Sequence, residues 1–152
     1  MSRQLAGHAL VVDDVQEVRE LFAHFLGRSG MRVTQADGGR AALAAARCLT
    51  PDVVVTDISM PDMDGLELCR QLRAEPVLQH LLVLVVSGNG PATDPAVWAA
   101  GCDEVLEKPC SRAALVSTVQ RLLDTGRHRR QSRPSSLPGQ PRAIATSAGS
   151  TP

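Results

Sequence analysis

The hydrophobic and polar positions of the chain alternate between two patterns. Short, mostly apolar runs rich in valine are each followed by a longer amphipathic stretch. The apolar runs are 9–12, 31–36, 53–56, 81–87 and 104–106, and the stretches that follow them are 15–28, 39–48, 65–74, 95–100 and 112–123. Apolar runs of this length are typical of strands buried on both faces, and the amphipathic stretches are typical of helices. The pattern predicts an α/β fold of five strand-and-helix units, with a parallel sheet covered by helices on both faces.

Residues that favour helix ends agree with these boundaries. Asp64 begins a stretch that resembles a capping box, Asp94 precedes a proline, and Ser111 is suited to cap the last helix. Gly101 and Gly126 are of the kind that follows a helix, so we expect the last two helices to end before them.

The composition limits the class of protein and the kind of core. The chain has 152 residues, of which 43% are hydrophobic, and this suits one globular domain. Phe22, Phe25 and Trp98 are its only Phe, Tyr or Trp residues, so the core must be aliphatic. The four cysteines form no CxxC pair, which argues against a zinc site or a disulfide framework. No apolar run is long enough for a signal peptide or a membrane span, and we therefore expect a cytoplasmic protein.

The formal net charge is zero, but it is unevenly distributed. Residues 127–152 hold five of the sixteen basic residues and no acid, so residues 1–126 carry eleven bases against sixteen acids, a net of about −5. This last segment is rich in Pro, Ser, Gly and Arg, with too few apolar residues to offset the entropy of ordering it. We expect a disordered basic tail, which lacks the aromatic residues of a nucleic-acid-binding segment.

Polar residues follow four of the five predicted strands. Asp13 and Asp14 follow the first strand, Asp57 the third, Ser87 the fourth and Lys108 the fifth. Because the carboxyl ends of parallel strands meet at one edge, we expect these side chains to lie close together. Three neighbouring carboxylates repel one another unless a cation compensates, and Mg²⁺ prefers such oxygen ligands. The sequence therefore predicts a magnesium site at this edge.

Lys108 is the only lysine in a chain whose other fifteen basic residues are all arginine. Its compact ammonium can meet a phosphoryl group as a point charge, which the planar fork of an arginine cannot do. Taken one at a time, an aspartate pair, a serine or a lysine after a strand has an ordinary surface role. Their joint placement at one edge points to phosphoryl chemistry.

Four motifs resemble the receiver domain of two-component response regulators. They are VVDD at 11–14, TDISMPDMDG at 56–65, VVSG at 85–88 and EKP at 107–109. The resemblance covers about residues 7–124 and divides the chain into an N-terminal extension (1–6), a receiver domain (7–124) and the basic tail (125–152). It implies a five-stranded parallel (βα)5 sheet of the flavodoxin-like type, with strand order 2-1-3-4-5.

The resemblance also implies a role for each residue at the acidic edge. Asp57 would accept a phosphoryl group, and Mg²⁺ would be bound by Asp57, directly by Asp14, through water by Asp13, and by the backbone carbonyl of Ser59. Ser87 would turn its hydroxyl toward the phosphoryl oxygens.

Further residues beside that edge also have implied roles. Gly88 would leave the approach open, and Lys108 would pair with Asp57 or its phosphoryl group. The Lys108–Pro109 bond would be cis.

One position departs from the family pattern. Receiver domains usually have Tyr or Phe three residues before the lysine, where this chain has Val105. Without that ring, the usual route from the phosphorylated site to the last two helices is in doubt. We expect Trp98, in the short fourth helix, to be either a core residue or a partly exposed contact that covers the space left by Val105.

The implied partners are a sensor histidine kinase or phosphotransfer protein and a downstream protein target. A homodimer through the face formed by the fourth helix, fifth strand and fifth helix is a further possibility. No DNA-binding domain is expected, because no helix-turn-helix follows Leu123.

Two other functions fit part of the pattern. An interaction module that works without phosphorylation is compatible with Val105, although the complete acidic site argues against it. An aspartate-nucleophile phosphohydrolase would need a second aspartate two residues after the first, and Ser59 stands there instead. We therefore expect a signalling receiver that catalyses only its own phosphorylation and dephosphorylation.

Overall fold

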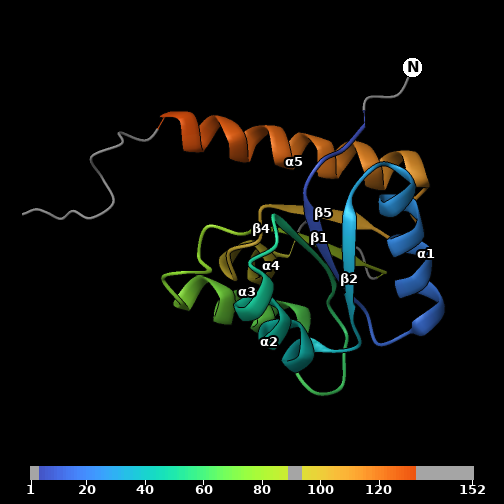
Figure 1. The fold of residues 1–152 in the computed structure, drawn as a ribbon. Helices are drawn as coiled ribbons and strands as arrows, with labels where there is room; N and C mark the ends of the chain where they lie inside the picture. Colours follow the sequence, from blue (N-terminus) through green and yellow to red (C-terminus); the bar gives the residue numbers. More distant parts are fainter. Residues whose placement is uncertain (1–3, 89–93, 133–152) are drawn as a thin grey trace, which may run out of the picture.

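The computed structural model describes residues 4–88 and 94–132 of the chain. Five parallel strands form one sheet in the order β2-β1-β3-β4-β5, as expected (Figure 1). The strands are β1 His8–Val12, β2 Arg32–Ala36, β3 Val53–Asp57, β4 Leu82–Ser87 and β5 Glu104–Glu107. The helices are α1 Gln16–Arg28, α2 Gly39–Leu49, α3 Gly65–Ala74, α4 Pro95–Ala99 and α5 Arg112–Ser132.

Helices cover both faces of the sheet, as the apolar strands predicted. On one face, alternate strand residues such as Leu10 and Val54 pack against α2, α3 and α4. On the other face, their neighbours Val11 and Val55 pack against α1 and α5. The strands β1, β3 and β4 are buried throughout except for Asp57 at the end of β3. This two-faced burial explains why these strands are valine-rich rather than alternating.

The predicted caps of three helices are present. The Asp64 side chain accepts a hydrogen bond from Glu67 N, that of Asp94 accepts one from Ala96 N, and Ser111 Oγ accepts one from Ala114 N. These bonds satisfy amides that have no partner inside the helix.

The last helix is longer than the sequence predicted. It begins at Arg112 as expected but continues to Ser132, so residues 125–132 of the expected tail are helical. Gly126 is not a helix end. It is buried where α5 crosses the start of β4, and a Cβ at this position would lie 3.0 Å from Leu82 Cδ1. The glycine therefore lets the helix approach the sheet closely, and the remaining tail residues 133–152 lie outside the described residues.

The boundary at the other end also needs correction. Leu5, which we placed in the N-terminal extension, is buried in the core, and its N–H donates to Ser29 O at 2.7 Å. Residues 1–3 of that extension lie outside the described part of the chain.

Candidate functional site

The carboxyl edge of the sheet brings the predicted acidic residues together. Asp57 is the last residue of β3, and Asp13 and Asp14 directly follow β1. Since β1 and β3 are neighbours, one carboxylate oxygen from each of the three residues falls within 4.8 Å of the others. The spacing agrees with the expected like-charge cluster.

Lys108 places its ammonium inside this cluster. Its Nζ lies 3.1 Å from Asp13 Oδ2 and 3.3 Å from Asp57 Oδ1. Burial opposes the charged form, but the hydrogen bond that Lys108 donates to Asp13 and the negative charges of Asp13 and Asp57 raise the pKa of Lys108 above its ordinary value. Lys108 is therefore a positive charge held between two carboxylates.

Asp13 is the most enclosed of the three acids. Its side chain is only 2% exposed, and its Oδ1 accepts a hydrogen bond from Val15 N at 2.9 Å. Its own N–H donates to Ala36 O in β2. Asp14, in contrast, is exposed to solvent. The pair thus offers one fixed carboxylate and one accessible carboxylate.

Asp57 lies between these extremes, with a side chain that is 13% exposed. Burial raises the pKa of Asp57, the charge of Lys108 lowers it, and the charge of Asp13 raises it again, with a net increase. Three carboxylates face one ammonium, so the site has an excess of negative charge. A divalent cation with oxygen ligands would offset this excess, and the donor set therefore fits Mg²⁺.

The backbone around Asp57 is held by the motif that follows it. Gly65 N donates to Ile58 O at 2.8 Å, and a Cβ on Gly65 would overlap the Asp57 carbonyl oxygen. Thr56 Oγ1 donates to the same carbonyl at 2.8 Å. Ser59, whose carbonyl is the expected metal ligand, is exposed and lines a cavity of about 460 Å³ with Asp14. Glycine at position 65 is therefore required by the close approach of α3 to β3.

The predicted residues of β4 and β5 also lie at this edge. Ser87 ends β4 and is buried, and its carbonyl accepts a hydrogen bond of 2.8 Å from Lys108 N. A Cβ on Gly88 would meet no atom of the described residues within 4 Å, so this part of the structure leaves the position open. The Lys108–Pro109 peptide bond is cis, as the resemblance implied.

Val105 and Trp98 lie away from the acidic cluster. Val105 is half-buried and packs against the core beneath α2, α3 and α4. Trp98 in α4 is 44% exposed. Of the two alternatives that the sequence left for this residue, the partly exposed position is therefore confirmed and the core position is wrong. Val97, its neighbour, is 1% exposed and anchors this short helix.

Sequence reasoning missed an ionic network at the opposite edge of the sheet. Arg73, at the end of α3, donates to Asp103 Oδ2 at 2.8 Å, and the same oxygen accepts from Val83 N. No periodicity or motif pairs these residues, which are 30 positions apart. Nothing in the sequence distinguishes them from exposed surface charges.

Comparison with known proteins points to one family. The family model for the response regulator receiver domain matches residues 9–120. The response regulator MprA of Mycolicibacterium vanbaalenii is 38% identical over 115 residues, covering 75% of this chain and 49% of that protein. The transcriptional regulatory protein FixJ of Azorhizobium caulinodans is 38% identical over 125 residues, covering 81% and 57%. The chain thus spans about half the length of these curated relatives.

Solved structures agree as well. The chemotaxis protein CheY4 of Vibrio cholerae is 30% identical with a TM-score of 0.73, and the match covers 78% of this chain and 99% of that one. NtrX of Brucella abortus, solved with ADP, is 30% identical with a TM-score of 0.78, and the match covers 94% and 31%.

The described residues contain no helix with both the length and the apolar character needed to cross a membrane. The β2-β1-β3-β4-β5 sheet, the acidic cluster with its lysine, and the match over residues 9–120 all point the same way. The chain belongs to the response regulator receiver domain family, a family of signalling modules whose standard function is phosphorylation on an aspartate.

Proposed function

We propose that Asp57 is the phosphoryl acceptor and that its donor is a phosphohistidine of a sensor histidine kinase or a phosphotransfer protein. The observation that supports this choice is the contact of 3.3 Å between Asp57 Oδ1 and the Lys108 ammonium. Asp13 is almost fully enclosed, and among the described residues Lys108 forms ion pairs with Asp13 and Asp57 but not with Asp14, so Asp57 combines access with a compensating charge.

In the proposed step, an Asp57 carboxylate oxygen attacks phosphorus as the bond from phosphorus to the histidine nitrogen breaks. The electron pair of that bond returns to the imidazole ring, which leaves. Lys108 would stabilise the negative charge that spreads over the phosphoryl oxygens. Ser87, at the end of the neighbouring strand, would donate its hydroxyl to one of those oxygens.

Asp13, Asp14, Asp57 and the carbonyl of Ser59 would hold Mg²⁺. When bound, the metal would supply positive charge that stabilises the phosphoryl group during transfer. Hydrogen bonds from Val15 N and Lys108 Nζ fix the carboxylate of Asp13, whereas the exposed carboxylate of Asp14 would be free to bind the metal directly. Lys108 is not a ligand in this scheme, because it is an ammonium.

The modified site would signal by protein–protein contact. Val105 cannot act as a rotating ring, so we assign the output to the exposed Trp98 and to the face formed by α4, β5 and α5. That face is also where we would expect a homodimer or a downstream target to bind. The chain would catalyse only its own phosphorylation and dephosphorylation, in the cytoplasm.

Intact mass spectrometry tests the acceptor. Incubation with acetyl phosphate and magnesium should add one phosphoryl group to the protein, and Asp57→Asn and Asp57→Ala should remain unmodified. Asp37→Asn is a matched control, because Asp37 is an exposed aspartate that follows β2. Stoichiometric labelling of Asp57→Asn would move the acceptor to Asp13 or Asp14.

A receiver-like module that binds its partner without phosphorylation is the second candidate, because Val105 replaces the usual ring. A folded, magnesium-binding protein that acquires no phosphoryl group would favour it. A phosphohydrolase is disfavoured, since the exposed Ser59 occupies the position of its second aspartate.

A further inference from the structure

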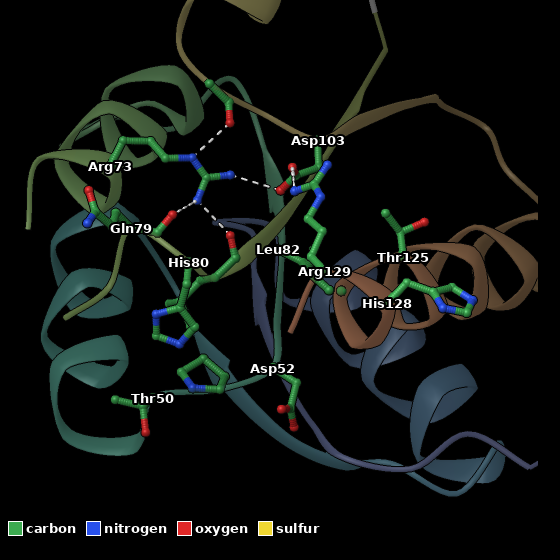
Figure 2. Close-up of a pocket in the computed structure, with 14 residues that line it drawn as sticks. Thr50, Asp52, Arg73, Gln79, His80, Leu82, Asp103, Thr125, His128 and Arg129 are labelled. Carbon is green, nitrogen blue, oxygen red and sulfur yellow. Dashed lines mark hydrogen bonds and ion pairs between the residues drawn. The ribbon is translucent and has the colours of Figure 1, made fainter. Parts of the chain in front are cut away.

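The amino edge of the sheet carries a second cavity, of about 1070 Å³ (Figure 2). It is lined by the segments that precede β3, β4 and β5 and by the part of α5 that the sequence did not predict. Small-molecule sites are cavities of comparable size with a few uncommitted polar groups. The acidic cluster lies at the other end of the same strands, so this cavity is separate from it.

The two carboxylates that line the cavity are already engaged. Asp103 Oδ2 accepts hydrogen bonds of 2.8 Å from Arg73 Nη2 and from Val83 N. Asp52 Oδ2 accepts one of 2.8 Å from His8 N, at the start of β1. Both acids therefore serve the fold, and the charge of Asp103 is offset by Arg73.

Arg73 is engaged in the same way. Besides Asp103, it donates to the backbone carbonyls of Gly101, Gln79 and Leu81 at 2.9, 2.9 and 2.6 Å. Figure 2 shows its guanidinium surrounded by these partners. Since its nitrogens are occupied by protein oxygens, Arg73 forms the rigid wall of the cavity rather than a contact for a ligand.

The groups that remain available are donors. Arg129 Nη1 lies 3.8 Å from Asp103 Oδ1, beyond hydrogen-bond distance, and its side chain is 67% exposed. A pair this long and this exposed contributes little, so the guanidinium can turn to another anion. Among the described residues, neither the ring of His80 nor the hydroxyl of Thr125 has a hydrogen-bond partner, and both residues are exposed at the cavity.

The position of these donors depends on the extension of α5. Gly126 is buried against Leu82, which holds the helix over the edge of the sheet and brings Thr125 and Arg129 to the cavity. His80 lines the cavity from the loop between α3 and β4, but in Figure 2 its ring points toward Thr50 and away from Arg129. Uncommitted donors on the α5 wall, beside carboxylates that each already accept a hydrogen bond at Oδ2, suit a ligand that accepts hydrogen bonds and carries negative charge.

We propose that this cavity binds a small oxyanion, either a carboxylate or a phosphate ester, through the guanidinium of Arg129, with the hydroxyl of Thr125, one turn earlier on α5, as a further donor. The inference does not rest on phosphorylation of Asp57. It assigns the helical extension of α5 a role in forming a second site, at the edge opposite the acidic cluster.

Titration of the full chain, labelled with ¹⁵N and free of magnesium, tests the proposal. Inorganic phosphate and succinate are added separately, with sodium chloride holding the ionic strength constant. At least one anion should cause saturable shifts in the amides of 50–52, 79–82, 101–103 and 125–129. A response to phosphate alone identifies phosphate esters as the ligand class, and a response to succinate alone identifies carboxylic acids.

Two variants locate the contact. Arg129→Gln should weaken binding roughly tenfold, because a charge-assisted hydrogen bond is lost. His128→Gln is the matched control: His128 lines the same cavity, but its ring points away from Arg73 and His80 in Figure 2, so affinity should be unchanged. Thr125→Val gives a second, uncharged test of the same wall and should also weaken binding.

Several results would overturn the proposal. They are the absence of saturable shifts with both anions, shifts centred on the acidic cluster, and equal affinity in the wild type and Arg129→Gln. An equal loss in His128→Gln would show that the general charge or stability of the helix, rather than a defined contact, governs binding.

Discussion

The ammonium of Lys108 donates a hydrogen bond of 3.1 Å to Asp13 Oδ2, which belongs to a residue 95 positions earlier in the chain. The same nitrogen lies 3.3 Å from Asp57 Oδ1. The ammonium of Lys108 thus contacts two carboxylates at the same time: that of Asp13, just after β1, and that of Asp57, at the end of β3.

Lys108→Arg should slow phosphorylation of Asp57 roughly tenfold or more, although the charge is kept. The planar fork cannot contact both carboxylates from the position of the ammonium. The rate of phosphoryl incorporation from acetyl phosphate measures the effect. Arg112→Lys, the reverse exchange at an exposed position in the first turn of α5, should leave the rate unchanged. Equal rates for wild type and Lys108→Arg would remove the special role of lysine.

Asp57→Asn should raise the melting temperature of the metal-free protein at pH 7. Burial and the charge of Asp13 raise the pKa of Asp57 above its ordinary value of 3.8, so the folded state binds this proton more tightly than the unfolded state does. The stability from that proton is present below the unfolded pKa and is lost as pH rises through the folded pKa. Asp57→Asn has no carboxylate to ionise, so it avoids this loss of stability. The difference in melting temperature between the variant and the wild type should therefore become smaller as the pH falls toward 3.8.

Thermal denaturation over a pH series measures this difference. Asp37→Asn, at an exposed position, should melt like the wild type throughout. A variant at position 57 that is less stable than the wild type at pH 7 would show that the contact with Lys108 outweighs the burial of the charge.

Gly65→Ala should disturb the acceptor without touching a charged group. The added Cβ would overlap the carbonyl oxygen of Asp57, and backbone on both sides leaves no flexible side chain to move. We expect a lower melting temperature and slower phosphorylation together. Gly88→Ala, at the same edge but with open space around it, should be far milder in its effect on stability.

Gly126→Val should destabilise the fold by about 1–3 kcal/mol, the usual cost of an overfilled contact. The valine would press on Leu82 and lift the end of α5 from the sheet. Denaturant unfolding gives the free energy. Gly27→Val is the matched control, because Gly27 is also helical but has open space at the Cβ position. Equal losses in the two variants would mean that helix propensity alone explains the effect.

Trp98 should report phosphorylation through its fluorescence. The ring is 44% exposed, and it is the only tryptophan in the chain. Adding magnesium with beryllofluoride, a phosphoryl mimic, should shift its emission maximum or its quenching by acrylamide. Unchanged emission and quenching, with mimic binding verified by another method, would place the output on a different face.

The sequence alone predicted those strands and helices that are determined by the pattern of neighbouring residues. Continuous valine runs indicated buried parallel strands, and the polar residue after each run then fell at the shared edge. Asp13, Asp14, Asp57 and Lys108 meet there because strand order brings β1 and β3 together, which the apolar pattern alone did not establish.

The end of α5 could not be predicted in the same way. Gly126 is a helix breaker by propensity, and the residues after it are polar. Tertiary packing reverses both signals, because the missing side chain permits contact with Leu82, 44 positions earlier in the numbering. The Arg73–Asp103 pair was missed for a related reason. The other partners of the Arg73 guanidinium are backbone carbonyls, and their direction depends on the fold.

The strand β4 extends from Leu82, at the cavity on the amino edge of the sheet, to Ser87, at the acidic cluster on the carboxyl edge. Six residues span roughly 20 Å, so two ligands can be bound at its ends without contact. Any influence between them must be reciprocal, because both draw on the same conformational equilibrium. An anion that binds more tightly to the phosphorylated form by a given factor must favour that form by the same factor. Titrating the cavity with and without a phosphoryl mimic would therefore measure, from the far end of the strand, how strongly the acceptor site is coupled to its surroundings.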